Sequence, residues 1–466
     1  MIRIDLLPDD VLLDIFDFHA STSVDMSSRY YDKKKTQAWQ SLVHVCRRWR
    51  TLVFGSPRRL DLKLYLSPKT RAKGGLDIWP ALPLIIYGNL GSSSSNTIAA
   101  LEQSDRVREI ALWGWELQEF LALMQVPFPE LTDLQLLPYI ETPVILDSFL
   151  GGSAPRLRFL RLDRIPFPGL PKLLLSATHL VQLQLDRIPH SGYISPQVMV
   201  APLSMLSSLE ELHLGFQSPQ SRPDWESQSL PPPRRSILPA LTKFRFKGVT
   251  EYLEDLMTHI DTPQLDEMHI TFFNQIDFDC PRLAQFINCT PTLRVLDEAH
   301  VQFADSAASV RLRSRTHEIS FGYLLIDISC KEPDWQLSSI EQVSNFVLRP
   351  LSAVEDLYIE DQHWEPIWKN EVIESTLWLQ LLLPFTAVKK LFLSKEFAPG
   401  IAVTLQELVG GRITEVLPSL QNIFVNELEL SGSFHETIMQ FVATRRLSNH
   451  PITISDWNKD SYPGWS

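Results

Sequence analysis

Ten copies of one apolar pattern, apolar-x-x-apolar-x-apolar, restrict the folds that this 466-residue chain can adopt. The first copy reads "VREIAL" and a late one reads "VKKLFL". Copies start 23 to 34 residues apart, with one longer gap after Leu265. One unit of this size cannot bury its apolar residues alone, so neighbouring units must stack. The copies start at Val107, Leu131, Leu157, Leu180, Leu209, Leu241, Leu265, Val354, Val388 and Leu420.

Each unit predicts a turn, a short strand and a return segment, because proline precedes many copies, as in "PELTDL" and "PALTKF". Two degenerate copies, "LRVLDE" from Leu293 and "THEISF" from Thr316, fill the longer gap. The pattern resembles the leucine-rich repeat. That resemblance implies an α/β chain with a parallel sheet on the concave face of a solenoid. Unit lengths vary, so we expect an irregular solenoid with long return helices or loops.

The residues between the leucines must point to the concave face, because side chains alternate along a strand. They mix charged and aromatic types, as protein-binding surfaces do, although a solvated strand face has the same composition. The candidate target-binding residues are Trp113, Arg161, Asp163, His213, Lys243, Arg245, Lys247, His269, Tyr358 and Phe392.

The segment "LLPDDVLLDIFDF" predicts an amphipathic helix near the N-terminus. Pro8 suits a first helical turn, and the two aspartates after it place negative charge at the positive end of the helix dipole. Val11, Leu12, Ile15 and Phe16 then form one apolar stripe. This stripe is larger than a lone helix can hide from water, so another surface must cover it.

A second helical pattern follows after a loop predicted over residues 19–35. In "TQAWQSLVHVCRRWRTLVFGSP" the apolar residues keep helical spacing from Trp39 to Val53, until Gly55 and Pro57 end the helix. A module of about 55 residues buries little area, so an obligate partner or a docked second domain is physically reasonable.

These two segments together resemble the F-box, whose motif begins with Leu-Pro, continues with Ile-Phe and ends with Val-Cys and Trp. The following "PRRLDLKL" and "LDIWPALPLIIYG" also look like F-box proteins of mushroom-forming fungi. The resemblance implies that the module docks onto a Skp-type adaptor and so joins a cullin–RING ubiquitin ligase. Each matched residue could instead be an internal core residue. The implied adaptor contacts are Leu7, Pro8, Val11, Leu12, Ile15, Phe16, Val45, Cys46 and Trp49.

The net charge of −12 is unevenly distributed. Residues 1–60 carry +3 and the remainder carries −15. Five arginines between Arg47 and Arg59 leave open a nucleic-acid-binding role for the module, but the acidic body disfavours general binding to phosphate backbones.

No sequence motif for catalysis, nucleotide binding or metal binding is present, so we expect no enzyme activity, no cofactor and no metal. The four cysteines match neither a zinc site nor a disulfide framework, which favours a reducing compartment, cytoplasmic or nuclear. The most apolar run, residues 377–385, is about half the ~20 residues of a membrane span.

The sequence thus predicts four parts: an F-box at 1–56, a connector and N-terminal cap at 57–100, a repeat solenoid at 101–440, and a C-terminal cap or tail at 441–466. The leading hypothesis is a substrate-recognition subunit of an SCF-type cullin–RING ubiquitin ligase, which holds an unknown target on the repeats. A protein-interaction scaffold without degradation remains the alternative.

Overall fold

The computed structural model describes two compact units, residues 1–183 and 184–466. Residues 19–21 of the predicted loop belong to the first helix, and the rest of that loop lies outside the described residues. Most of the segments at 91–96 and 215–236 and the copy from Thr316 also lie outside them. The four-part division of the chain stays a prediction. The described residues are 7–21, 38–67, 76, 81–90, 95–140, 144–219, 235–275, 277–294, 296–314, 322–362, 375–408, 412, 414–427 and 433–457.

The first unit begins with three short helices, which we call the helical module (residues 7–56). They are α1 (Asp9–Ser21), α2 (Ala38–Val43) and α3 (Arg47–Gly55). The predicted second helix is therefore two helices. Cys46 has extended backbone angles (φ −158°, ψ 171°), which break the helix, and its sulfur accepts a hydrogen bond from the Trp49 N–H at 3.5 Å as the N-cap of α3. The spacing of apolar residues continues across this break, so the sequence pattern did not reveal it.

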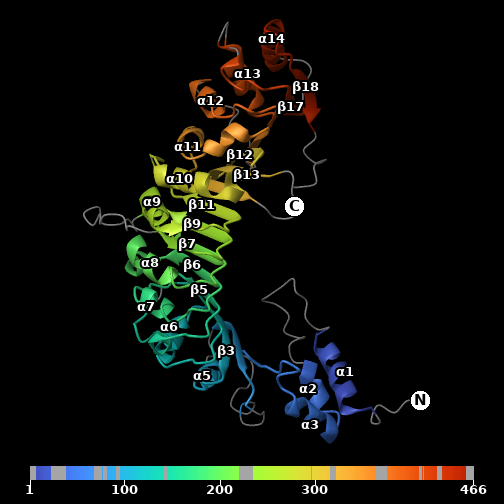
Figure 1. Ribbon diagram of the computed structural model, residues 1–466, viewed down its shortest axis with the longest axis vertical. Helices are drawn as coiled ribbons and strands as arrows, with labels where there is room; N and C mark the ends of the chain where they lie inside the picture. Colours follow the sequence, from blue (N-terminus) through green and yellow to red (C-terminus); the bar gives the residue numbers. More distant parts are fainter. Residues whose placement is uncertain are drawn as a thin grey trace. The chain divides into compact units, whose positions relative to one another are not determined.

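The remainder of the first unit is a parallel sheet in the order β1-β2-β3-β4-β5, with α5, α6 and α7 on one side (Figure 1). Its strands are β1 (Leu64–Leu66), β2 (Leu84–Leu90), β3 (Val107–Gly114), β4 (Asp133–Pro138) and β5 (Phe159–Asp163). Its helices are α5 (Ser95–Leu101), α6 (Leu117–Leu123), the 3-10 helix η2 (Phe149–Gly152) and α7 (Leu170–Leu174). The segment predicted as connector and cap therefore contributes two strands of the sheet.

The second unit contains a sheet in the order β7-β9-β11-β14-β13-β12-β15-β16-β17-β18. Its strands are β7 (Glu211–Phe216), β9 (Lys243–Gly248), β11 (Glu267–Phe272), β12 (Glu298–Ala304), β13 (Ala307–Arg313), β14 (Tyr323–Ile328), β15 (Asp356–Asp361), β16 (Lys390–Leu393), β17 (Asn422–Asn426) and β18 (Thr453–Trp457). Strand β6 (Gln182–Ile188) spans the division between the units, and β8 (Ser236–Ile237) pairs separately with β10 (Ile260–Asp261).

Helices of the second unit pack side by side along one face of its sheet (Figure 1). They are α8 (Pro196–Leu203), α9 (Thr250–His259), α10 (Pro281–Cys289), α11 (Pro333–Phe346), α12 (Ser375–Leu382), α13 (Ala398–Gln406) and α14 (Ser433–Leu447), with the 3-10 helices η3 (His190–Gly192), η5 (Pro291–Arg294) and η6 (Arg349–Ala353).

Each of the ten copies of the apolar pattern corresponds to one strand, and its apolar residues form the buried side of that strand. All three apolar positions of every copy are at most 4% exposed. Equivalent positions of neighbouring copies pair in register, as in Asp356, Lys390 and Asn422 of three successive strands. Each buried leucine contributes roughly 2 kcal/mol by leaving water. The α/β class and the parallel, one-strand-per-unit sheet are therefore confirmed.

The longer gap in the repeat holds an antiparallel insertion. Strand β13 runs antiparallel to both β12 and β14, which place it between them. Because Glu298 pairs with Asp356, the apolar positions of β12 are Leu296, Ala299 and Val301, so the predicted frame from Leu293 is wrong by three residues. Leu293 is also buried, but it lies in η5.

Candidate protein-interaction surfaces

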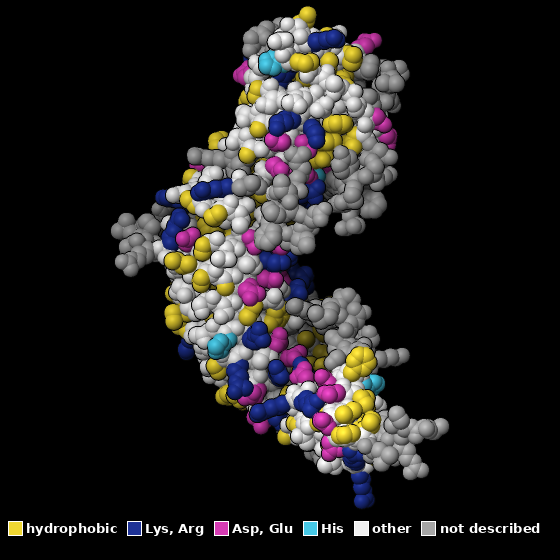
Figure 2. Space-filling model, turned by 45° about the vertical axis from the view of Figure 1, so that its right-hand side comes forward, with side chains coloured by type: hydrophobic (Ala, Val, Ile, Leu, Met, Phe, Trp, Pro, Cys, Tyr) yellow, Lys and Arg dark blue, Asp and Glu magenta, His cyan; other side chains and the backbone are white. Residues whose placement is uncertain are grey.

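The helical module exposes a set of apolar side chains, which we call the module surface: Val11, Ile15, Phe18 and Val45. Phe18 is 71% exposed and Val45 is 58% exposed. Figure 2 shows apolar and acidic side chains gathered on this module. Large apolar groups left in water on so small a body are typical of a surface that another protein covers.

The structure divides the nine implied adaptor contacts between this surface and the interior. Leu12 and Phe16 are fully buried, the alternative that the sequence left open for each matched residue. They form the core of the module, where Phe16 packs on Trp49 at 4.7 Å between ring centroids. Val11, Ile15, Val45, Cys46 and Pro8 are exposed, while Leu7 and Trp49 are half-buried. Adaptor contact by these seven stays a prediction.

Phe18 was missed by the sequence reasoning, although its signal was present. It lies three residues after Ile15 and seven after Val11, so the three share one side of α1. The predicted stripe included Leu12 and Phe16 instead, and these two residues lie on the buried side of the helix.

Three of the five arginines that suggested nucleic-acid binding have partners inside the module. Arg48 donates to the Asp9 carboxylate at 2.5 Å and to the Leu7 carbonyl at 2.6 Å. Arg50 donates to the Val43 carbonyl at 3.0 Å, and Arg59 pairs with Asp14. The Arg48 contacts join α3 to the N-terminal segment, and the two ion pairs reduce the positive charge that a phosphate backbone would meet.

Along each strand, the residues between the buried apolar positions lie on the face of the sheet opposite the helices. We call this face the open face. In the first unit it includes the half-buried side chains of Trp113 and Arg161. Asp163 is only 4% exposed, so its prediction as an accessible contact is corrected. It is the last residue of β5, and the chain turns after it through Arg164 in a left-handed conformation (φ 54°).

The open face of β7, β9 and β11 carries histidines that are held by carboxylates. The His213 imidazole lies 3.1 Å from Asp186. The His269 imidazole lies 2.6 Å from Asp327 and 3.3 Å from the Thr271 hydroxyl. Both rings are thus fixed in orientation by neighbouring groups, and both are half-buried.

The lysines and arginine of β9 complete this part of the open face. Lys243 pairs with Glu267 at 3.2 Å. Arg245 and Lys247 are exposed, and the Lys247 ammonium lies 5.8 Å from the Phe273 ring centroid. All three, with His213 and His269, lie on the open face, and target binding by these five residues stays a prediction.

The open face changes character beyond β12, where stacked rings replace accessible side chains. Tyr358 is 6% exposed and Phe392 is 2% exposed, so both are corrected from accessible contacts to core residues. Parallel strands place equivalent rings about 4.8 Å apart, and Tyr358 stacks between His300 at 4.3 Å and Phe392 at 4.2 Å. Trp457 of β18 packs edge-on against Tyr358 and Phe392.

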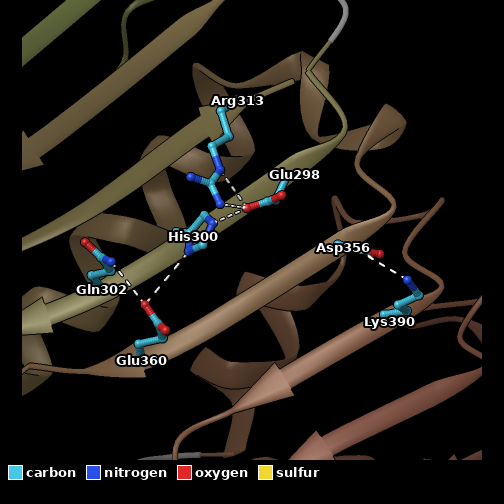
Figure 3. A network of polar contacts seen from close by, with 7 residues as sticks. All are labelled: Glu298, His300, Gln302, Arg313, Asp356, Glu360 and Lys390. Atoms are coloured by element: carbon cyan, nitrogen blue, oxygen red, sulfur yellow. Dashed lines mark hydrogen bonds and ion pairs between the residues drawn. The ribbon is translucent and has the colours of Figure 1, made fainter. Parts of the chain in front are cut away.

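A buried polar network lies beside these rings (Figure 3). The Glu298 carboxylate contacts His300 and Arg313, each at 2.5 Å. Gln302 donates to Glu360 at 3.0 Å. Burial alone would raise the pKa of Glu298, but the hydrogen bond and charge of His300, together with Arg313, hold that pKa below its ordinary value.

The described part of the chain contains no group of three or more His, Cys, Asp or Glu placed to hold a metal ion. No helix among the described residues is long and apolar enough to cross a membrane. The four cysteines are free.

Comparisons with known proteins return little by sequence. No family model matches the chain, and no curated protein matches it. Among solved structures it is similar to the leucine-rich repeat-containing protein LegL7 from Legionella pneumophila, with 11% identity and a TM-score of 0.25, over 82% of this chain and 97% of that chain. The repeat fold is established instead by the chain's own parallel strands and buried apolar triplets.

Proposed function

We propose that this chain is the substrate-recognition subunit of an SCF-type cullin–RING ubiquitin ligase. Its helical module, which resembles the F-box, binds a Skp-type adaptor, and the open face of its repeats binds a target protein. The chain itself performs no catalysis. Ubiquitin transfer is left to the RING and conjugating enzymes of the complex, in the cytoplasm or the nucleus.

The observation that carries this proposal is the module surface. Val11, Ile15 and Phe18 lie along one side of α1, and Val45 lies in the turn that breaks the second predicted helix. Burying such residues against an adaptor would remove large apolar groups from water, at about 25 cal/mol per Å². The F-box resemblance supplies the identity of the adaptor.

The repeats suit the second half of the role, because stacked strands give an extended face of polar, charged and aromatic side chains. Holding a target on that face while the module holds the adaptor raises the concentration of target lysines near the ubiquitin-loaded enzyme.

The test is co-purification of the full chain with a Skp-type adaptor and cullin, compared with a Val11→Asp, Ile15→Asp variant. Both positions are exposed, so the substitutions leave the core residues Leu12 and Phe16 in place. A matched control, Val198→Asp with Val403→Asp, changes two exposed valines on α8 and α13.

We expect the wild type and the control to retain both partners and the module variant to lose both. Retention of the adaptor without cullin would favour the non-degradative scaffold. Failure of the wild type to bind the adaptor would overturn the proposal.

A further inference from the structure

Strand β9 presents three cations in a row on the open face. Lys243, Arg245 and Lys247 alternate with the buried rings of Phe244 and Phe246, so all three side chains leave the same side of the strand. Successive members of this row are about 7 Å apart along the strand.

Three of the acidic side chains around this row are engaged by other groups. Glu267 pairs with Lys243, Asp186 contacts His213, and Asp327 contacts His269. Within the described part of the chain, no ion pair or hydrogen bond engages Arg245 or Lys247. The row therefore ends in two adjacent cations whose donors are open to an external anion.

Arg311 adds a further cation to the same face. It occupies the ladder position that leads through Leu325 and His269 to Arg245. Its guanidinium lies 5.8 Å from the Tyr323 ring centroid, and its Nε is buried with no hydrogen-bond partner.

We propose that the open face of β9 binds an extended acidic peptide segment, in which two acidic side chains two residues apart pair with Arg245 and Lys247. Side chains at alternate positions of an extended peptide lie on one side and about 7 Å apart, which matches the spacing of the two cations. Arg245 gives the segment a planar donor group for a carboxylate, and Lys247 gives a compact charge. The inference rests on the proposed function in one respect, since it names the class of target that the repeats would hold.

An acidic peptide fits this surface better than a nucleic acid does. A duplex or a long single strand carries a continuous line of phosphates, and it would meet Glu211, Glu267, Asp186 and Asp327 on either side of the two cations. A peptide can place its two acidic side chains between these carboxylates and uncharged residues beside them.

The test measures anisotropy of a labelled decapeptide with Glu and Thr alternating, titrated with the full-length chain at low salt. The same decapeptide with Gln for Glu, and a thymidine decanucleotide, serve as comparison ligands. The protein variant is Arg245→Gln with Lys247→Gln. Its matched control, Lys389→Gln with Lys390→Gln, removes the same charge from lysines paired with Glu355 at 2.6 Å and Asp356 at 3.7 Å.

We expect the acidic decapeptide to bind, the Gln peptide to bind at least tenfold more weakly, and Arg245→Gln with Lys247→Gln to weaken acidic-peptide binding about tenfold. The control variant should change it less than twofold. Equal weakening by both variants, or no binding of the acidic peptide, would overturn the inference. Tighter binding of the oligonucleotide, lost in the Arg245 variant, would replace it with nucleic-acid recognition.

The adaptor experiment keeps this result separate from the proposed function. If the adaptor binds while the acidic peptide does not, only the inference about β9 fails. If the peptide binds while the adaptor does not, the chain holds acidic segments in some other assembly.

Discussion

At the scale of single residues, Glu298 shows how a carboxylate on the open face can be ionised although it is buried. Its side chain is 5% exposed, yet its pKa is held below the ordinary value of 4.5 because His300 and Arg313 contact the carboxylate. Arg313 is partly exposed and can recover hydration when the contact is lost. The penalty for removing the carboxylate is therefore smaller than for a fully buried pair.

Glu298→Gln should lower the free energy of unfolding by about 1–3 kcal/mol at neutral pH, the usual range for a hydrogen bond to a charged group. A carboxyl whose pKa is lowered by folding stabilises the protein above its unfolded pKa of about 4.5 and loses that contribution as the pH falls through its folded pKa. The difference between wild type and variant in urea titrations should thus shrink as the pH falls below ~4.5.

The exposed pair of Lys389 and Glu355 provides the comparison, since Lys389→Gln should cost about 0–1 kcal/mol. A Glu298→Gln effect no larger than that of Lys389→Gln, or one that does not change between pH 6 and pH 3, would contradict the burial of this network.

Gly114 ends β3 with φ +132°, a conformation that side chains with a Cβ rarely adopt. A Cβ there would lie 2.5 Å from the Leu90 carbonyl oxygen. Gly114→Ala should therefore destabilise the chain by about 1–3 kcal/mol, measured as a lower urea midpoint. Gly55→Ala is the control, because a Cβ at that helical position meets nothing within 4 Å and should be neutral or stabilising by up to ~1 kcal/mol. Equal effects of the two substitutions would disagree with the left-handed backbone at Gly114.

Strand alternation predicted the facing of single residues but not their accessibility. It correctly placed Arg245 and Lys247 on the open face, where both are exposed. It also placed Tyr358 and Phe392 there, yet both are buried because rings on adjacent strands cover one another and Trp457 covers them in turn. The alternation of one strand contains no information about what the next strands carry.

At the scale of elements, the insertion β12–β13–β14 is the place where the repeat pattern of the sequence did not predict the strand positions correctly. The copies from Val107 to Leu265 could be read directly from their apolar triplets and spacing. Between Leu293 and Val301 the degenerate frame from Leu293 overlaps a weaker triplet, Leu296, Ala299 and Val301, and the pairing of Glu298 with Asp356 shows that the strand uses the second. Partner choice in a sheet depends on segments far apart in the chain, which local spacing cannot specify.

The last strand is held to the sheet through Trp457, whose indole lies edge-on to Phe392 at 5.4 Å and to Tyr358 at 5.8 Å. Trp457→Ala should remove this cover and lower the free energy of unfolding by about 3 kcal/mol, near the lower end for a buried tryptophan because β18 is an edge strand. Trp335→Ala, at an exposed tryptophan on α11, should change it by no more than ~0.5 kcal/mol. Similar shifts of the thermal midpoint in the two variants would rule out a closing role for β18.

At the scale of the whole molecule, the chain offers two surfaces of different chemistry. The module surface is apolar and lies in the first unit, whereas the cations of β9 lie in the second. The sequence predicted both regions, because helical spacing and strand alternation act over a few residues. It could not predict which members stay accessible, since Leu12 and Phe16 belong to the segment that resembles the F-box and are nevertheless buried.

A receptor that links an adaptor to a target needs the two surfaces to act independently. Val11→Asp with Ile15→Asp should weaken adaptor binding at least tenfold and change acidic-peptide binding less than twofold, while Arg245→Gln with Lys247→Gln should do the reverse. Free-energy changes at sites without shared partners add within about 0.5 kcal/mol, so the combined variant should show the sum of the two effects. Titrating wild type, each pair and the combination with adaptor and with peptide measures this directly. If the module variant weakened peptide binding as much as the β9 variant does, the peptide would be occupying the module surface, and a receptor with separate adaptor and target sites would be the wrong description of this chain.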